Sequence, residues 1–446
     1  MIKEATHRLF LLCAFLLAAA SAGAQTGTRI YVDLEGTATN DGTSWKTATD
    51  LATALGQAQA GAEIWVKGYE ATDKVYVVPE GGYTLPAGVA LYGGFAGDET
   101  SINQREVVDG IAYRMRYRTV LTGDRTTPDE VDPTTLIFPE NGTRSDNATH
   151  VLMLDLSTGS GSLNSGAASI VNGITIARGH AVGSGDAGYG GGIYVTPGTN
   201  QQVGYRIEQC FFIENYATQG GGLYVADNVS NVNGSTCLVD RCGFFNNAAG
   251  DRAVLANKGG AIYLGGAGCV VNTAVFNNEN GGILTNNTNN PGVRVLNSTV
   301  ARNTASGIDG SGAQVVNTVI WGNAALHTDE TASPDFRYCA YPEVVVTDET
   351  AGTDNENNVR LSDKNNDADG PRFNSPSLRT GFDRDFNITT TLYPLWTWVP
   401  LEGSPLVDAG NDDAFSTSAY GSTDFGGQLP QGGHGRRHRR LRVSAR

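Results

Sequence analysis

The stretch EQCFFIENYATQGGGLY (208–224) contains the two short motifs that decide the fold. In the first, an apolar residue stands three positions before an asparagine, as in Phe212 and Asn215. In the second, a glycine pair precedes an aliphatic residue and a tyrosine, as in Gly221-Gly222-Leu223-Tyr224. Both motifs recur in alternation through a repeat core, residues 173–323. The asparagines of the first motif are Asn215, Asn247, Asn278, Asn303 and Asn323, and the glycine pairs begin at Gly191, Gly221, Gly259 and Gly281.

The spacing of the first motif varies too much for a propeller. Its apolar residues follow one another after 36, 32, 31, 25 and 20 residues, counted from Ile176, whose copy ends in Gly179 instead of asparagine. Propeller blades need a steadier period of about 40 to 50 residues, whereas a solenoid coil can release excess residues as loops. Repeats this short cannot bury an apolar face alone. We therefore predict an all-β, single-stranded right-handed parallel β-helix, a solenoid with a short N-terminal capping helix.

Equivalent residues on successive coils would lie about 4.8 Å apart, so like side chains would stack on like. The five asparagines are then expected to form an amide ladder, as in cross-β stacks. Asparagine also tolerates a left-handed backbone, so the ladder residues are assigned to a sharp corner between strands. The glycine pairs mark another corner, where no Cβ fits. Phe212, Phe244 and their counterparts would point inward as an apolar column.

The cysteines do not form a disulfide framework. Five remain after residue 24, an odd number, and no Cys-x-x-Cys or Cys/His spacing suggests zinc. Cys210 and Cys242 share one register, so we expect two stacked thiols there, with a disulfide as the alternative.

The two motifs together resemble the GGA[IL] and FxxN repeats of the polymorphic outer membrane proteins, within the pectin-lyase-like right-handed β-helix class. The matching residues are Gly259-Gly260-Ala261-Ile262 and the stretch from Phe244 to Asn247, with their degenerate copies. The resemblance covers roughly a third of the chain. It implies an exported β-helix protein of a Gram-negative bacterium.

The N-terminal part is similar to the opening of secreted β-helix proteins of the Bacteroidota, in the stretches NDGTSW (40–45), AEIWV (62–66) and LYGGFAG (91–97). Leu51, Leu55 and Ala58 predict one amphipathic helix over 49–60, with Gly61 as its stop. Strands are expected over 64–66, 75–78, 89–92 and 119–121. Because an open β-helix end exposes apolar core, we assign residues 25–61 to a cap region and 62–399 to the β-helix with its loop insertions.

Charge and the N-terminus indicate export. The 446 residues carry a formal net charge of −15, which excludes nucleic acid as a partner. Residues 1–24 read as a signal peptide: Lys3 and Arg8 precede an apolar run, and Ala22-Gly23-Ala24 forms a small-residue cleavage site. No later run is long enough for a transmembrane helix. We expect a monomer that is secreted or held at the outer membrane or cell surface.

Residues typical of polysaccharide-cleaving enzymes are present but scattered. Asn411-Asp412-Asp413 and Gly433-His434-Gly435 resemble polygalacturonase motifs, yet both follow the repeat core. We interpret the acidic residues between 173 and 323 as standing at no common position of the repeat. Arg178 and Arg302 do stand at the same position of the repeat, but they are several coils apart. No catalytic residue and no cofactor are therefore assigned.

Asp363, Asn365 and Asp367 imitate the start of a calcium loop. Ala368 stands where such a loop needs glycine, and Asn374 where it needs a bidentate glutamate. An ordinary acidic loop is expected, with a calcium site as the alternative.

The C-terminal region changes character. Residues 400–430 resemble the closing segment of the secreted family, with SPLVDAGN (404–411) as the match. Residues 431–446 form an anomalous basic tail with six arginines, which we interpret as a frameshift product, with a genuine basic tail as the alternative.

These features favour an adhesin-like scaffold that binds an extracellular glycan or a partner surface, because a rigid rod with variable loops suits recognition. A polysaccharide lyase or glycoside hydrolase on the same fold is the first alternative, and a passive spacer is the second. The fold does not decide among them.

Overall fold

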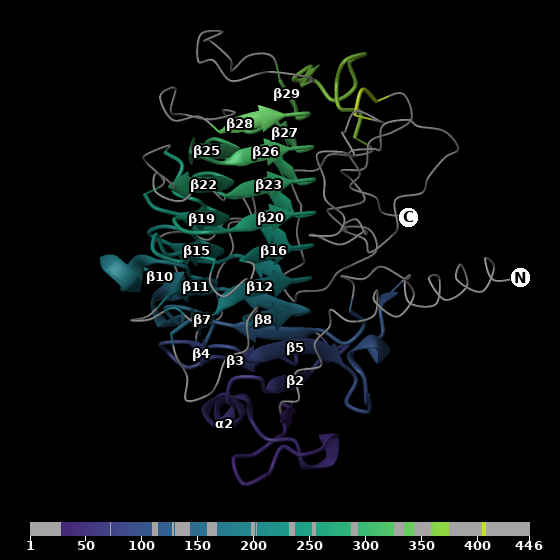
Figure 1. Cartoon of the computed structure of the whole chain (residues 1–446), viewed down its shortest axis with the longest axis vertical. Coiled ribbons are helices and arrows are strands. Elements are labelled where there is room, and N and C mark those ends of the chain that lie inside the picture. The colour runs from purple at the N-terminus through teal and green to yellow at the C-terminus, as the bar shows by residue number, and fades with distance from the viewer. Residues whose placement is uncertain are drawn as a thin grey trace, which may run out of the picture.

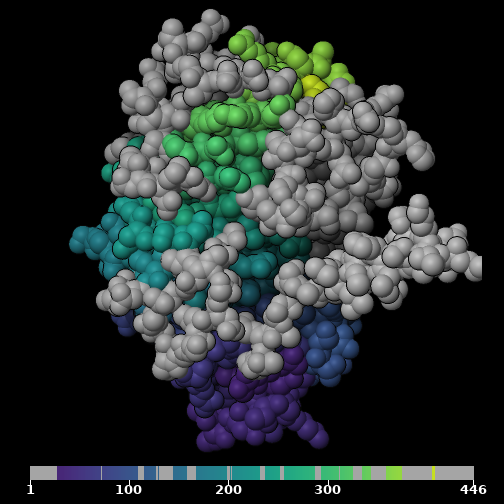
Figure 2. Space-filling view, in the orientation of Figure 1, coloured from purple at the N-terminus to yellow at the C-terminus, as the bar shows by residue number. Residues whose placement is uncertain are grey.

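Three parallel β-sheets wind around one apolar core in the computed structural model of the chain (Figure 1). The coloured coils of the space-filling view follow one another from purple to green along the long axis (Figure 2). The structure describes residues 28–71, 73–108, 115–126, 129, 143–157, 167–197, 201, 203–231, 237–251, 256–286, 293–324, 334–342, 358–373 and 404–406.

Sheet I stacks ten strands in one direction: β1 (Arg29–Val32), β2 (Glu63–Lys67), β5 (Ala90–Phe95), β8 (Ala168–Asn172), β12 (Gly204–Glu208), β16 (Leu238–Asp240), β20 (Cys269–Val271), β23 (Arg294–Leu296), β26 (Gln314–Val316) and β28 (Asp335–Arg337). Sheet II stacks β3 (Tyr76–Val77), β6 (Thr119–Thr122), β9 (Ile174–Ala177), β13 (Phe211–Ile213), β17 (Gly243–Phe245), β21 (Ala274–Phe276), β24 (Thr299–Ala301), β27 (Val319–Trp321), β29 (Ala340–Pro342) and β30 (Val359–Leu361).

Sheet III stacks β4 (Tyr83–Leu85), β7 (Leu152–Asp155), β11 (Ile193–Thr196), β15 (Leu223–Val225), β19 (Ile262–Leu264), β22 (Ile283–Asn286) and β25 (Ile308–Ser311). A small sheet joins β10 (His180–Ala181), β14 (Tyr216–Ala217) and β18 (Ala248–Ala249). The 3-10 helices are η1 (Trp45–Thr47), η2 (Ile102–Gln104), η4 (Thr143–Asp146) and η5 (Gly185–Gly188).

Each coil visits sheets III, I and II in turn, as the chain does in β11, β12 and β13 before it enters β15 one coil further on. All strand pairs in the three sheets are parallel, and neighbours in each sheet come from successive coils. The fold is therefore the predicted right-handed parallel β-helix.

Side chains that point inward stack in columns. Phe212, Phe244, Val275, Val300 and Ile320 are register partners on five successive strands of sheet II, and each is at most 1% exposed. The first two rings stack with centroids 4.3 Å apart. The column changes side-chain size at two of its four steps, from Phe244 to Val275 and from Val300 to Ile320, and every member remains buried.

One asparagine amide per coil forms a ladder beyond sheet II. The side-chain oxygen of Asn247 accepts both the backbone N–H of Asn215, at 3.1 Å, and its side-chain N–H, at 2.9 Å. The same pair of hydrogen bonds joins Asn247 to Asn278, Asn278 to Asn303 and Asn303 to Asn323. Gly179, which ends the first copy, donates its N–H to the oxygen of Asn215. The amides thus satisfy buried backbone donors at every corner.

The left-handed corner lies one residue earlier than predicted. Positive φ angles occur at Arg178, Glu214, Asn246, Asn277 and Arg302, each directly before a ladder position. The expectation that the ladder asparagines themselves take this conformation is wrong. The preceding residue makes the turn, and the ladder residue that follows can then direct its amide along the stack.

The glycine pairs stand where neighbouring coils approach closely. A Cβ on Gly260 would lie 2.0 Å from the carbonyl oxygen of Glu279, and one on Gly192 would lie 2.3 Å from that of Gly222. These contacts leave no room for a side chain at the entry to sheet III.

The helix α2 (Leu51–Gln57) covers the N-terminal end of the stack (Figure 1). Leu51, Ala54 and Leu55 are buried against the first coils, and Asp50 caps the helix by accepting the N–H of Thr53 at 2.9 Å. The helix is shorter than the predicted 49–60, because Thr49 pairs with Val32 and the chain leaves the helix at Ala58 to enter β2. Strand β1 lies inside the predicted cap region, yet it already belongs to sheet I.

The outer face of sheet II is apolar and buried. The cluster on this face includes Phe211, Ile213, Phe245, Phe276, Ala301, Trp321, Phe373 and Leu406. Phe373 and Leu406 come from beyond the last coil, and the Phe373 ring lies 5.8 Å from the Trp321 ring. Ser404 donates its hydroxyl to the carbonyl of Pro371. Residues 404–406, where the closing segment was predicted to match its family, therefore pack against sheet II.

All five cysteines after residue 24 are buried free thiols, so the stacked-thiol expectation for Cys210 and Cys242 holds. The signal peptide, the residues 411–413 and 433–435, and the basic tail lie outside the described residues. Among the described helices, none combines the length and apolar character that a membrane crossing requires.

Asn247→Ala is expected to weaken the fold more than any surface substitution. It removes the acceptor of two donors of Asn215 and the donor that serves the carbonyl of Phe212, all in a buried site. Unpaired buried groups cost about 1–3 kcal/mol each, so we expect a loss of about 2–4 kcal/mol in the free energy of unfolding. Urea denaturation measures it, with the exposed Asn228→Ala as the control. Equal midpoints for the two variants would contradict the role of the ladder.

Candidate functional site: two charged clusters on the coils

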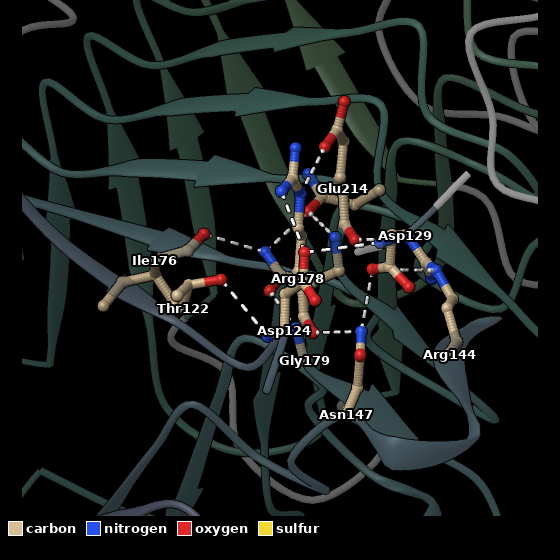
Figure 3. A network of polar contacts seen from close by, with 11 residues as sticks. Thr122, Asp124, Asp129, Arg144, Asn147, Ile176, Arg178, Gly179 and Glu214 are labelled. Carbon is tan, nitrogen blue, oxygen red and sulfur yellow. Dashed lines mark hydrogen bonds and ion pairs between the residues drawn. The ribbon is translucent and has the colours of Figure 1, made fainter. Parts of the chain in front are cut away.

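Six polar side chains gather beyond the ends of neighbouring strands of sheet II (Figure 3). We call them the sheet II cluster: Asp124, Asp129, Arg144, Asn147, Arg178 and Glu214. Asp124, Arg178 and Glu214 follow β6, β9 and β13, three adjacent strands. The other three come from the segment that connects β6 to β7.

Arg178 holds the three coils together. Its Nε lies 3.1 Å from Glu214 on the coil above, and its Nη1 lies 3.1 Å from Asp124 on the coil below. The positive φ of Arg178 and Glu214 places both side chains at the same corner. All three side chains are at most 13% exposed.

The connecting segment supplies the second half of the cluster. Asn147 donates its side-chain N–H to Asp129, at 2.9 Å, and to the carbonyl of Arg178, at 2.8 Å. Arg144 lies 3.9 Å from Asp129 and donates to the carbonyl of Glu214 at 2.7 Å. The segment is therefore tied to two coils at once.

Burial dominates the electrostatics of the cluster. Desolvation raises the pKa of Glu214 even though Arg178 and Arg144 oppose the shift. Desolvation likewise raises the pKa of Asp129, against the pull of Arg144. The nearby His180, whose Nδ1 contacts the carbonyl of Arg144, has its pKa lowered to about 4, first by burial and then by that arginine.

The sheet II cluster is suited to holding structure. Its carboxylates bond to other members of the cluster, and the side chains of Asp129 and Arg144 are 0% and 5% exposed. A catalytic acid or base must reach the substrate within hydrogen-bond distance. We therefore interpret the cluster as a clamp that fastens the segment between β6 and β7 to the coils.

Two residues of the clamp could have been identified from the sequence. Arg178 was noted as standing two residues after an apolar anchor, but Glu214 stands at the same position in the next copy. Comparing all residues at that position would have found the pair. Asp129, Arg144 and Asn147 lie outside the repeats, so no register could have placed them.

A second cluster lies at the outer face of sheet I, and we call it the sheet I pair: Glu208 and Asp240. They are register partners on β12 and β16. The expectation that the acidic residues of the repeat share no register is therefore wrong for these two. Each of the two stands seven residues before a ladder asparagine, Asn215 or Asn247, so the spacing of the motif already places them in one register.

Arginines and asparagines surround the sheet I pair. Arg206 pairs with Glu208, and Arg241 lies 2.7 Å from Asp240. Asn172 donates to Glu208 at 3.0 Å, and Asn272 donates to Asp240 at 3.2 Å. Burial raises the pKa of Asp240, and the charge of Glu208 adds to the shift against the effect of Arg241.

Two adjacent carboxyl groups, one of which keeps its proton more firmly, form the kind of arrangement that acid–base chemistry on a glycosidic bond uses. Their side chains are 11% and 4% exposed. The sheet I pair thus has the residue types that such chemistry needs. Both of its carboxylates are already paired with arginines.

Two of the three candidate calcium residues, Asn365 and Asp367, make hydrogen bonds within their own loop. Asn365 donates to the carbonyl of Phe373 and accepts its N–H, at 2.8 and 2.7 Å. Asp367 accepts the hydroxyl of Ser362 at 2.7 Å. Within the described residues, no three His, Cys, Asp or Glu side chains are grouped so that they could hold a metal ion.

Comparison with known proteins supports no closer assignment. No family model and no curated protein matches the chain. Among solved structures, the chain is similar to a crystal structure of the pectate lyase Pel9A, with 13% identity over 92% of this chain and 98% of that one, at a TM-score of 0.44. It is also similar to a complex of XylC with xylose, with 11% identity over 71% and 76% of the two chains, at a TM-score of 0.26.

Glu214→Gln is expected to flatten the pH dependence of stability. Because the Glu214 pKa is raised on folding, the native state holds the proton more tightly than the unfolded chain does. The free energy of unfolding therefore falls as pH rises above 4.5, the ordinary value of this carboxyl. Glutamine cannot ionise, so the variant lacks this contribution.

Urea denaturation at acidic and neutral pH measures the difference. The wild-type protein should lose more stability than Glu214→Gln between the two conditions, whereas the exposed Glu80→Gln should behave like the wild type. Equal losses in wild type and Glu214→Gln would contradict the raised pKa of Glu214.

Proposed function

We propose that the protein is an exported β-helix scaffold, secreted or held at the surface of a Gram-negative cell, that binds an extracellular glycan in the manner of an adhesin. The observation that supports this proposal is the placement of its loops. They gather at the two ends of the sheet III strands.

Within the repeat core, the connections between sheets I and II are uniformly tight. Two residues join the strands on each coil of the repeat core, at 209–210, 241–242, 272–273, 297–298 and 317–318. The connections that leave sheet III vary instead, from 226–237 down to 312–313, and those that enter it vary from 178–192 down to 302–307. Variable loops on a rigid scaffold are the usual location of recognition.

The charged side chains of the coils also favour binding over catalysis. Both clusters are closed by ion pairs within the protein, and their carboxylates are mostly buried. A scaffold that keeps its charges engaged in this way can present neutral polar groups to a ligand without long-range repulsion from those charges.

A polysaccharide lyase or glycoside hydrolase is the second candidate, and the sheet I pair is the observation that favours it. Glu208 and Asp240 lie on adjacent coils, with Arg206 and Arg241 beside them.

A glycan array probed with the purified full chain tests the proposal, together with assays for new reducing ends and for unsaturated products. We expect retention on at least one glycan without release of product. No binding to any glycan would overturn the proposal in favour of a passive spacer, and product release would overturn it in favour of the enzyme.

Asp240→Asn separates the two candidates. The binding proposal predicts an affinity unchanged within about twofold, because the residue lies away from the loops. Removal of a general acid would instead lower product release by about 10²-fold or more. Isothermal titration and the product assays measure both quantities, with Asp335→Asn, on the same face of sheet I, as the control.

A further inference from the structure

The outer face of sheet III carries a row of large side chains in one register. Met153, Tyr194, Tyr224, Tyr263 and Leu284 are partners on five successive strands. Their neighbours Ile193 and Val195 are fully buried in the core, so the alternation of a strand directs the row outward. This face is the one whose two edges carry the variable loops.

Three tyrosine rings in this region form a continuous stack. The Tyr224 ring lies between that of Tyr189, 4.2 Å away and parallel within 1°, and that of Tyr263, 4.5 Å away and parallel within 6°. Tyr194 meets the stack edge-on, with its ring 5.7 Å from that of Tyr224. The stack holds the phenol groups rigidly, so a ligand that binds them would not need to order them first.

Polar groups of both kinds surround the phenol ends. Tyr194 donates to Asp186 at 2.9 Å, Tyr263 donates to Asp227 at 3.4 Å, and Asn286 donates to Tyr263 at 3.1 Å. Asp186, Asp227 and Asn286 are exposed. Tyr224 keeps 5% of its surface exposed at this outer face, and its hydroxyl bonds to no described residue, so it is the phenol of the stack that is left for a ligand.

The phenols stay protonated at any physiological pH. Burial first, and the neighbouring Asp186 and Asp227 after it, raise the pKa of Tyr194 and of Tyr263 to about 12. The protons of Tyr194 and Tyr263 are already donated to the two carboxylates, so the face offers the Tyr224 hydroxyl and the Asn286 carboxamide as donors, beside carboxylate and amide acceptors. Sugar hydroxyl groups both donate and accept hydrogen bonds, and this mixture matches them.

Charge selects among ligands for this face. Two carboxylates and a net charge of −15 disfavour a polyanion such as a uronate or a sulfated chain. A basic peptide would suit the carboxylates, but each already accepts a tyrosine hydroxyl, and an ammonium group has no acceptor for the Tyr224 hydroxyl or the carboxamide N–H. A neutral polyol satisfies donors and acceptors together.

We propose that the outer face of sheet III is a binding site for a neutral glycan chain, contacted by Tyr189, Tyr224, Asp186, Asp227 and Asn286. This inference rests on the proposed function and names its site and ligand class. The sugar hydroxyls accept from the phenol and the carboxamide and donate to the two carboxylates, and the chain lies along the stack between the loops.

Three variants test the site in the full chain. Tyr224→Phe keeps the ring in the stack and removes its hydroxyl, so we expect affinity for the neutral glycan to fall about fivefold. Asp227→Asn is expected to lower it about tenfold, because a charge-assisted bond is lost. Tyr92→Phe, on the outer face of sheet I, is the matched control and should leave affinity unchanged.

Titration of neutral glucan, mannan and xylan oligosaccharides, of oligogalacturonate and of oligolysine measures the affinities, with thermal melting to verify each fold. Binding of a neutral oligosaccharide that is insensitive to salt and weakened by the first two variants alone is the expected result. Preferred binding of oligogalacturonate or oligolysine would overturn the inference.

The outcomes separate the site from the function. A wild-type protein that binds a neutral glycan, with Tyr224→Phe and Asp227→Asn equal to it, would overturn the site and leave the proposed function standing. A wild-type protein that binds none of these ligands and no glycan on the array would overturn both.

Discussion

The structure depends on the hydrogen bond that each coil makes to the next through an asparagine amide. Backbone ladders pair the strands, but a corner has no strand partner, and its buried N–H and C=O groups need another one. Asn215, Asn247, Asn278 and their counterparts supply it. The Asn247 amide, for example, accepts two donors from Asn215 on the preceding coil, and donates to the carbonyl of Phe212 on that same coil and to Asn278 on the next one. A coil can then vary its loops freely without loss of register.

That constraint explains how far the sequence could predict the molecule. A ladder needs the same residue at the same place in every coil, so the asparagines and the apolar residues before them are visible as a repeat. The glycine pairs are visible for the same reason, because each lies within reach of a neighbouring carbonyl. The turn residue before each asparagine varies among Arg178, Glu214 and Asn246, so the left-handed corner was assigned one position too late.

Features without a repeat could not be predicted in this way. Asp129 and Arg144 reach the clamp from a long connection, and their partners lie up to 70 residues away. The sheet I pair could have been found by aligning the strands that precede the asparagine motif, since Glu208 and Asp240 are partners there. Tyr224 and Tyr263 end copies of the glycine motif, and nothing in that motif says which way the tyrosine points.

The proposed function rests on where the coils can vary in loop length. Tight two-residue links fix sheets I and II to each other, whereas the ends of sheet III accept insertions on almost every coil. The rigid tyrosine stack lies between those insertions, and the charged clusters lie elsewhere and are closed on themselves. The proposed binding face on sheet III and the clamp on sheet II are thus separate products of the same coil geometry.

The stacking of like over like can be measured directly by cross-linking. Arg294 and Cys269 are register partners on the outer face of sheet I, and parallel neighbours lie about 4.8 Å apart, within the range that a disulfide spans. Arg294→Cys should therefore form a disulfide with Cys269 on oxidation, identified by mass spectrometry of unreduced peptides, whereas Val295→Cys, which points inward, should not. A bond from position 295, or none from position 294, would contradict the register on which the coil stack rests.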